Sequence, residues 1–300
     1  MPDSNGPNSA FTVPVWSLGA TLIVFALLLV AALQRPDGRL HLWVLDVGQG
    51  DAILLRTPKG HTALIDGGPG ATSLLNEMGE RLPFWQHDLD LLVLTHPHQD
   101  HMMGLIEVLE RYDVDQVLQT EFTPTLGLEG QWHYSVKSHN VPVHFPRRGE
   151  FVTFEGEPEI DLSVLSPSTS EAPQVQQNEQ INNSSIVLRL SYGEHDILLE
   201  GDAQEEAEGE MVRLPENEIA SEILKVGHHG SDTSSTPQFV NHIHPRVAII
   251  SVGADNKYGH PAGKTLQTLE EAGALIYRTD RNGTVEIIAD EEHMWVRSER

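Results

Sequence analysis

The densest group of chemically active side chains in this 300-residue sequence lies within residues 95–101. It holds three imidazoles and one carboxylate, at His96, His98, Asp100 and His101, directly after a short apolar run. Neutral imidazole nitrogens and carboxylate oxygens bind Zn²⁺ or Mn²⁺, and their alternate spacing allows one tight loop to serve two ions. A strand that ends in such a loop delivers these ligands where α/β folds carry their chemistry. The run therefore predicts a site for one or two divalent metal ions and says nothing, alone, of a substrate.

Similar polar side chains follow several other apolar runs that are typical of strands. These are Asp66, Asp202, His228, His229, Asn256, Tyr258 and His260. Taken singly, each has a plainer explanation: Asp66 suits an Asx turn, and Asp202 suits the N-cap of a helix over residues 203–210. Polar groups at the ends of several strands, converging beside a His-rich loop, are nevertheless the expected construction of a binuclear hydrolytic site.

Composition limits the ligands and the partners of such a site. The sequence has 16 His and no Cys, which excludes disulfides and thiolate ligands and leaves nitrogen and oxygen donors for any metal. Its net charge of -25 repels nucleic acid at long range. A divalent-metal cluster inverts that field locally, so a nucleic-acid substrate is not excluded. Solubility or adaptation to a salty medium explains the charge more simply than a particular partner does.

The N-terminal region differs in character from the rest of the chain. Residues 1–12 are polar and predict a disordered tail. Residues 13–33 carry no charge and match the roughly 20 residues that span a bilayer as a helix. We predict an uncleaved transmembrane helix over 13–34, because the segment before it lacks the Lys or Arg of a signal peptide. Arg35 and Arg39 follow it and nominally favour a cytoplasmic domain.

After a short linker, residues 37–295 predict one domain in which strands alternate with a few helices. Apolar runs and turn signals predict strands over 40–47, 51–57, 62–65, 89–94, 116–119, 161–165, 186–190, 197–199, 223–226, 246–252, 275–279 and 284–288. Helical periodicity occurs over 104–111 and 265–272, whereas residues 120–180 indicate mainly loops. Strand-rich blocks with a few intervening helices are typical of two sheets in a layered α/β domain.

The motifs are similar to those of a known family. The His-rich run matches the HxHxDH signature of the metallo-β-lactamase superfamily, and Asp66 and Asp202 match its other strand-end carboxylates. The segments that carry a closer resemblance are residues 45–52, 64–68, 183–188, 199–203, 224–231 and 251–261. In this order they resemble the C-terminal hydrolase domain of ComEC-family competence proteins over residues 40–290. The resemblance implies a four-layer αβ/βα sandwich, an extracytoplasmic location at the cell membrane, and a nuclease that degrades the non-transported DNA strand during uptake.

The chain departs from the family pattern in two ways. The third motif of the superfamily supplies a further His in the middle of the domain, where this chain has Asn182 and Asn183, so one metal would lose a ligand. His133, His139 and His144 lie in that region, but their loop context predicts solvated side chains. The chain also has one predicted membrane segment instead of many, which suits either a fragment of a channel protein or a stand-alone anchored hydrolase.

The matching residues suggest how two ions would be held. His96 and His98 would bind the first ion, Asp100 and His101 the second, and Asp202 both. A water bound to metal, with its pKa brought toward neutrality, would be the nucleophile.

The last metal ligand is left open. His228 is preferred because it directly follows its strand, and His229 and His260 are rivals, either as ligands or as contacts to a phosphate. Asp66 is expected to orient a ligand His through its other nitrogen. The candidates for stabilising charge on the leaving side are Asn256, Tyr258 and Lys225, of which the last has the alternative of pairing within the sheet.

Three functions are compatible with these residues. The first is a metal-dependent phosphodiesterase that acts on DNA, preferably single strands, in competence-related uptake. The second is a metal-dependent hydrolase of a small ester, lactone or amide, since the same site on this fold serves many reactions. The third is a non-catalytic part of a DNA-uptake channel, with a membrane channel as its partner, and the missing third His motivates it.

Overall fold

The computed structural model describes residues 22–27, 30, 36–122, 126–168 and 178–300. The chain divides into two compact units, residues 1–35 and 36–300. The predicted tail 1–12 and most of the predicted transmembrane segment 13–34 lie outside the described residues, while residues 22–27 and 30 are helical. In the parts that are described, no helix is both long enough and apolar enough to cross a membrane.

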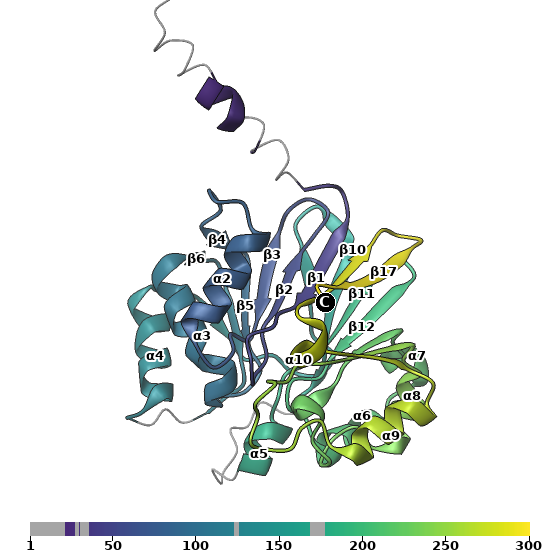
Figure 1. The fold of residues 1–300 in the computed structure, drawn as a ribbon. Coiled ribbons are helices and arrows are strands. Elements are labelled where there is room, and N and C mark those ends of the chain that lie inside the picture. Colours follow the sequence, from purple (N-terminus) through teal and green to yellow (C-terminus); the bar gives the residue numbers. More distant parts are fainter. Residues whose placement is uncertain (1–21, 28–29, 31–35, 123–125, 169–177) are drawn as a thin grey trace, which may run out of the picture. The chain divides into compact units, whose positions relative to one another are not determined.

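Two sheets form the centre of the second unit (Figure 1). The strands of the first sheet are β1 (Leu40–Val44), β2 (Ile53–Arg56), β3 (Thr62–Ile65), β5 (Leu91–Leu94), β7 (Val117–Gln119), β8 (Val143–His144), β16 (Val285–Ala289) and β17 (Met294–Ser298). Among the described residues their order is β17-β16-β1-β2-β3-β5-β7-β8. The strands from β17 to β3 are antiparallel to their neighbours, and those from β3 to β8 are parallel. A separate small pair consists of β4 (Asp88–Leu89) and β6 (Asp113–Val114).

The second sheet has the same mixed character. Its strands are β9 (Phe151–Phe154), β10 (Glu157–Ser166), β11 (Val187–Tyr192), β12 (His195–Leu199), β13 (Ile223–Lys225), β14 (Val247–Ile250) and β15 (Leu275–Arg278). Their order across the described part of the sheet is β15-β14-β13-β12-β11-β10-β9. The strands β12 to β15 are parallel, so their carboxyl ends share one edge, and β9 to β12 are antiparallel.

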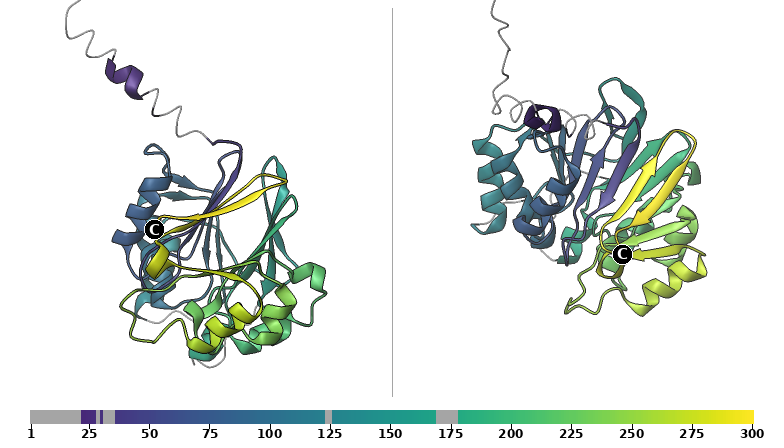
Figure 2. Two further views of the ribbon diagram at one scale, coloured as in Figure 1. Left: turned by 45° about the vertical axis from the view of Figure 1, so that its right-hand side comes forward. Right: turned by 45° about the horizontal axis from the view of Figure 1, so that its top comes forward.

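Helices cover the outer face of each sheet (Figures 1 and 2). The helices over the first sheet are α2 (Ala71–Arg81), α3 (Gln99–Arg111) and α4 (Leu128–Ser138). The helices over the second sheet are α6 (Glu205–Met211), α7 (Glu216–Ile219), α8 (Pro237–Ile243) and α9 (Gly263–Glu271). The short elements α5 (Asn178–Asn183), α10 (Thr279–Asn282) and the 3₁₀ helix η1 (Gly227–Gly230) lie in connections between strands.

Strand β5 illustrates how the layers are held together. Successive residues of a strand point to opposite faces, so an apolar strand between two layers packs on both sides. Leu91 and Val93 belong to the buried cluster between the two sheets. Leu92 and Leu94 belong to the buried cluster under α2, α3 and α4. A third apolar cluster packs α6 to α9 on the second sheet, which completes four layers and confirms the predicted sandwich.

The His-rich run is a helix start and not the tight loop that its spacing predicts. Helix α3 begins at Gln99, and His98 is its N-cap residue. Asp100 and His101 therefore lie in the first helical turn, where a carboxylate is favoured by the helix dipole. The predicted helix over 104–111 is thus correct but extends five residues further towards the N-terminus.

The prediction of mainly loops over residues 120–180 is wrong. This region contains the unpredicted helix α4 and the ten-residue strand β10, within which the predicted strand 161–165 is confirmed. Trp132 and Val136, four residues apart, pack α4 onto the helix-side cluster. His133 lies on α4 and His139 at its end, and both are exposed, as is His144 on β8. Their predicted loop context is therefore wrong, whereas the prediction of solvated side chains is confirmed.

Candidate metal centre

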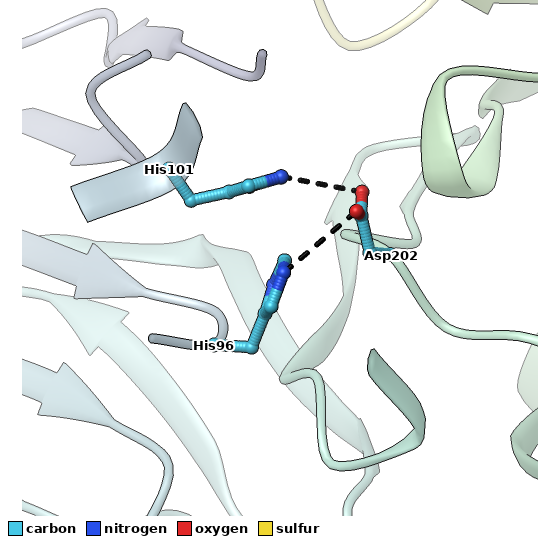
Figure 3. A group of neighbouring side chains, drawn as sticks. All are labelled: His96, His101 and Asp202. Carbon is cyan, nitrogen blue, oxygen red and sulfur yellow. Dashed lines mark ion pairs between the residues drawn. The ribbon is translucent and has the colours of Figure 1, made fainter. Parts of the chain in front are cut away.

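The site lies where strands from the two sheets end close to each other. β5 leads into His96 and, through the first turn of α3, into His101, whereas β12 leads into Asp202. His101 Nε2 lies 3.3 Å from Asp202 Oδ1, and His96 Nε2 lies 3.7 Å from Asp202 Oδ2. Figure 3 shows the two imidazole rings directed at this one carboxylate. Asp202 is therefore the point at which donors from both sheets meet.

A second group of donors adjoins the first. His229 Nε2 lies 3.3 Å from Asp100 Oδ2 and 3.7 Å from Asp202 Oδ1. The potential ligand atoms of Asp100, His101 and His229 lie within 4.8 Å of one another, and so do those of His96, His101 and Asp202. The two groups share His101. Asp202 belongs to the first group and lies 3.7 Å from His229 of the second, so the oxygen and nitrogen atoms of the two groups suit two neighbouring cations.

Buried atoms without hydrogen bonds mark the same place. Among the described residues, His98 Nε2, His101 Nε2, His229 Nε2 and Asp202 Oδ1 are buried and make no hydrogen bond. The other ring nitrogen of His98, Nδ1, lies 3.0 Å from His96 Nε2. The polar neighbours of these buried atoms are other side chains of the site, with His101 Nε2 3.3 Å from Asp202 Oδ1 and His229 Nε2 3.3 Å from Asp100 Oδ2. A divalent cation binds the lone pairs of such atoms, so these residues fit a metal ion with nitrogen and oxygen ligands.

Asp66 lies behind His101 and not among the other donors. Its Oδ2 lies 2.7 Å from His101 Nδ1, and its Oδ1 accepts a hydrogen bond from the Thr95 backbone N–H at 2.8 Å. The adjacent Gly67 lets α3 approach, because a Cβ there would lie 2.6 Å from the Leu105 backbone nitrogen. A carboxylate that orients a ligand imidazole requires this geometry. The orienting role of Asp66 stays a prediction.

His228 and His229 have different surroundings although they are adjacent. Both adopt left-handed backbone conformations, with φ of 47° and 54°, which are costly for residues other than Gly and concentrate at functional sites. His229 is buried, whereas His228 is half-buried. His228 Nε2 lies 3.9 Å from Asp202 Oδ2 and 3.4 Å from Nδ2 of Asn182. The structure thus brings both histidines to Asp202 and favours His229 as the enclosed donor.

The buried carboxylates of the site require positive charge. Burial opposes protonation of His101, but Asp202 and Asp66 outweigh it and raise the pKa of His101 well above its usual value. Burial opposes protonation of His229 in the same way, but Asp202 and Asp100 help to raise its pKa to about 10. The pKa of Asp202 is held well below its ordinary value by the same histidines, against the effect of burial. Two protons or a metal ion that displaces them can supply the charge.

Asp51 has no predicted role, yet it forms a buried ion pair behind His229. The Lys225 ammonium donates to Asp51 Oδ2, and each side chain is 1% exposed. Asp51 Oδ1 lies 3.3 Å from His229 Nδ1, which also lies 3.1 Å from the Ser251 carbonyl oxygen. Lys225 therefore pairs with a carboxylate inside the domain, and it does not line the cleft described below.

Removing one member of this pair should destabilise the domain strongly. Lys225→Met leaves the buried Asp51 carboxylate with His229, 3.3 Å away, as its remaining partner. We expect the free energy of unfolding to fall by about 3 kcal/mol, the low end for a broken buried pair. Urea unfolding at pH 7 measures the loss. The double variant with Asp51→Asn removes the buried negative charge and should recover most of it. Equal stability of Lys225→Met and the unsubstituted protein would show that the pair does not contribute.

The same pair predicts the acid stability of the domain. Burial alone would raise the pKa of Asp51, but Lys225 and His229 outweigh burial and lower it to about 2. In the unfolded chain this pKa is about 3.9. The stabilisation is therefore present above pH 4 and is lost as the pH falls towards 2. In Lys225→Met the ammonium no longer lowers the pKa of Asp51, so the part of the stability that is lost between pH 4 and pH 2 should shrink, which acid unfolding followed by circular dichroism would show.

A cleft of about 690 Å³ opens onto the donors. The predicted site residues that line it are His98, Asp100, Asp202, His228, His229, Tyr258 and His260. The Asn256 side chain instead holds its own loop, donating to the Gly253 and His260 carbonyl oxygens at 2.8 Å and accepting from the His260 N–H at 3.0 Å. Of the three candidates for stabilising a leaving group, Tyr258 alone lines the cleft.

The helix-cap alternative for Asp202 is wrong. Helix α6 begins at Glu205, and its N-cap residue is Gln204. Asp202 precedes the cap by two residues, and its backbone N–H donates to Ser185 Oγ at 3.2 Å. The side chain of Asp202 is therefore available to the histidines described above.

Comparison with known proteins agrees with this arrangement. Residues 45–254 match a family model described as the metallo-beta-lactamase superfamily. ComE operon protein 3 of Bacillus subtilis is 31% identical over 285 residues, which are 89% of this chain and 35% of that protein. Competence protein ComA of Neisseria gonorrhoeae is 29% identical over 259 residues, 84% of this chain and 32% of that protein. The chain thus spans about a third of the length of these curated relatives.

A solved structure shows the same fold. Igni18, a metallo hydrolase from the archaeon Ignicoccus hospitalis, superposes with a TM-score of 0.53 at 14% identity. The match covers 82% of this chain and 98% of that protein. At this level of identity the similarity concerns the fold alone.

Proposed function

This chain belongs to the metallo-beta-lactamase superfamily, and from that premise we propose that it is a metal-dependent phosphodiesterase that cleaves single-stranded DNA during uptake. The observation that carries the proposal is the convergence of His96, His101 and His229 from both sheets on Asp202. The competence proteins among its relatives motivate DNA as the substrate. A cleft that opens onto such donors suits hydrolysis assisted by two cations.

Some residues of the site would bind the metal ions, and others would orient the ligand histidines. The proposed ligands are His96, His98, Asp100, His101, His229 and the shared Asp202. When bound, the cations supply Lewis acidity and bring the pKa of a bound water towards neutrality. Asp66 holds His101 in orientation through Nδ1, and Asp51 holds His229 through its Nδ1.

His228 and His260 are proposed to contact the substrate. Both line the cleft, and burial lowers the pKa of each imidazole below its usual value. They are therefore neutral near pH 7, and each ring has one N–H that can donate to a phosphate oxygen. Gln204, whose Nε2 lies 2.9 Å from His228 Nδ1, sets which side of that ring faces the cleft.

Hydrolysis of a neutral ester, lactone or amide is a second candidate, and the cleft lining favours it. No Lys or Arg lies among the described residues that line the cleft, whereas Glu179, Glu205, Glu206 and Asp232 do. Carboxylates at the mouth repel a polyanion and do not affect a neutral substrate. Bound cations would offset this repulsion for a phosphodiester at the reaction centre only.

One assay separates the candidates. The purified protein with Mn²⁺ or Zn²⁺ is expected to cleave end-labelled single-stranded DNA, to stop when EDTA is added, and to leave a lactone and a β-lactam intact. Turnover of the lactone without cleavage of DNA would move the assignment to the second candidate. Turnover of none of them with either metal would indicate a non-catalytic part of an uptake channel.

We also propose that residues 13–34 anchor the chain in the cell membrane, with the domain outside the cytoplasm. The chain should then stay in the membrane fraction through alkaline carbonate extraction, as a spanning helix does and a peripheral one does not. Protease added to intact cells should digest the domain. A mature N-terminus near Gln34, found by mass spectrometry, would instead establish a cleaved signal peptide.

A further inference from the structure

Tyr258 differs from the other rings of the cleft in its exposure. It is 59% exposed, whereas the histidine rings of the lining are buried or half-buried. Among the described residues that line the cleft it is the only Phe, Tyr or Trp. A large aromatic ring that is exposed at a functional cleft offers a flat apolar face to a ligand.

The Tyr258 ring is also held in place. The side-chain hydrogen bonds of Asn256 close its loop. The ring stacks on His260, with centroids 5.7 Å apart and planes inclined by 25°. His260 in turn lies edge-on to His228 at 5.7 Å, and His228 Nε2 lies 3.9 Å from Asp202 Oδ2. A row of rings therefore leads from the mouth of the cleft to the metal centre, and little order must be gained on binding.

The walls of the cleft offer a nucleic-acid backbone little attraction. Four carboxylates stand at the mouth, and no Lys or Arg is among the described lining residues. A cation does lie over the aromatic ring, with Lys257 Nζ 5.6 Å from the Tyr258 centroid, and a base that stacks there would have to displace this flexible side chain. Proteins that bind single strands combine such cations with rings on which bases stack, and stacking tolerates any base sequence. With few phosphate contacts available, stacking has to supply most of the affinity.

We propose that Tyr258 is a stacking platform for a nucleobase of single-stranded DNA, beside the phosphodiester that the metal centre would cleave. This inference rests on the proposed function and adds the basis of its substrate preference. Bases in a duplex are already stacked on both faces, so a platform of this kind selects unpaired strands. The hydroxyl group of Tyr258 is not needed for stacking, so Phe should replace it.

The test compares a decathymidylate with a decamer of abasic sites that keeps every phosphate. Cleavage is measured as kcat/KM with Mn²⁺. Binding is measured by fluorescence anisotropy in two arms, one in EDTA and one with Ca²⁺, so that divalent cations that offset the carboxylates are present in the second arm. Tyr258→Ala is expected to weaken binding and kcat/KM for the decathymidylate by roughly tenfold, mainly through KM, and to leave the abasic strand unaffected. Tyr258→Phe, which keeps the aromatic ring, should bind the decathymidylate as tightly as the unsubstituted protein does. Tyr134→Ala, which removes a 73% exposed tyrosine from α4, is the matched control and should change neither quantity.

The outcomes distinguish the stacking platform from the phosphodiesterase activity. Three results would overturn the stacking role. They are equal losses of affinity for both strands in Tyr258→Ala, equal affinity of the unsubstituted protein for both strands, and a Tyr258→Phe that binds the decathymidylate as weakly as Tyr258→Ala does. Base-dependent binding without any cleavage would support the platform and overturn the phosphodiesterase. Cleavage of the decathymidylate that Tyr258→Ala leaves unchanged would support the phosphodiesterase and overturn the platform. A protein that binds and cleaves neither strand would overturn both.

Discussion

Asp202→Asn is expected to lower turnover by orders of magnitude and to reduce the metal content from two ions towards one. The two oxygens of Asp202 face different donors, with Oδ1 3.3 Å from His101 Nε2 and Oδ2 3.7 Å from His96 Nε2. The amide keeps the size of the side chain but deletes the negative charge that offsets repulsion between neighbouring cations. Both the nucleophilic water and the polarised substrate oxygen would depend on the two cations. Activity should therefore fall as the more weakly bound cation is lost. Elemental analysis of the dialysed protein and initial rates measure the two effects.

A matched control lies on β12, the strand that leads into Asp202. Asp196→Asn makes the same chemical change at the other end of β12, where Asp196 pairs with Arg189 away from the cleft. This variant should keep its metal and its activity. If Asp202→Asn also kept both, the shared-carboxylate assignment would be rejected.

His229→Ala is expected to remove most of the bound metal, whereas His228→Ala should keep it. Nε2 of His229 has two carboxylates within 3.7 Å, those of Asp100 and Asp202, and its ring is buried. Nε2 of His228 has one carboxylate at 3.9 Å, and its ring is only half-buried. We therefore expect His229→Ala to abolish turnover and His228→Ala to raise KM more than it lowers kcat, because His228 would contact substrate.

The two variants serve as controls for each other, because each removes one imidazole from adjacent positions of η1. Circular dichroism of the metal-free proteins checks that both are folded. The reverse result, with metal lost in His228→Ala and kept in His229→Ala, would restore His228 as the ligand that chain position alone favours.

Much of the fold follows from local patterns. Apolar runs such as 91–94 predict buried strands because the pattern is set by the two faces of a sheet, and the strands appear close to where they are expected. The His-rich run was a weaker guide to conformation, since metal-binding spacing is compatible with a loop and with a helix start. The loop prediction misses helix α4, although Leu128, Trp132 and Val136 recur at the four-residue spacing of a helix face, because Gly and Pro near the start of the segment favour loops.

The residues of the candidate site could be predicted from the sequence, but which of them are buried and which of them pair with each other could not. Strand ends identify Asp202, His228 and His229, but the left-handed backbone of both histidines decides which ring is buried, and no local pattern encodes that. The ion pair of Asp51 and Lys225 joins positions 174 residues apart, so neither neighbourhood indicates it. The sequence feature that could have drawn attention to Asp51 is its position in the glycine-containing segment 45–52, which carries the family resemblance.

The pairing of β1 with β16 has a consequence for biosynthesis. Leu40 lies opposite Ala289. The first strand of the domain to leave the ribosome therefore cannot pair on this side until β16, one of the last strands, has been synthesised. Contacts between such distant positions slow folding, and an unpaired strand edge can pair with other chains in the meantime. Until residues 285–298 have been translated, one edge of β1 in the nascent protein lacks its partner. The open edge of β1 is therefore the part of the nascent domain most exposed to pairing with another chain, and this exposure ends when β16 adds to the sheet.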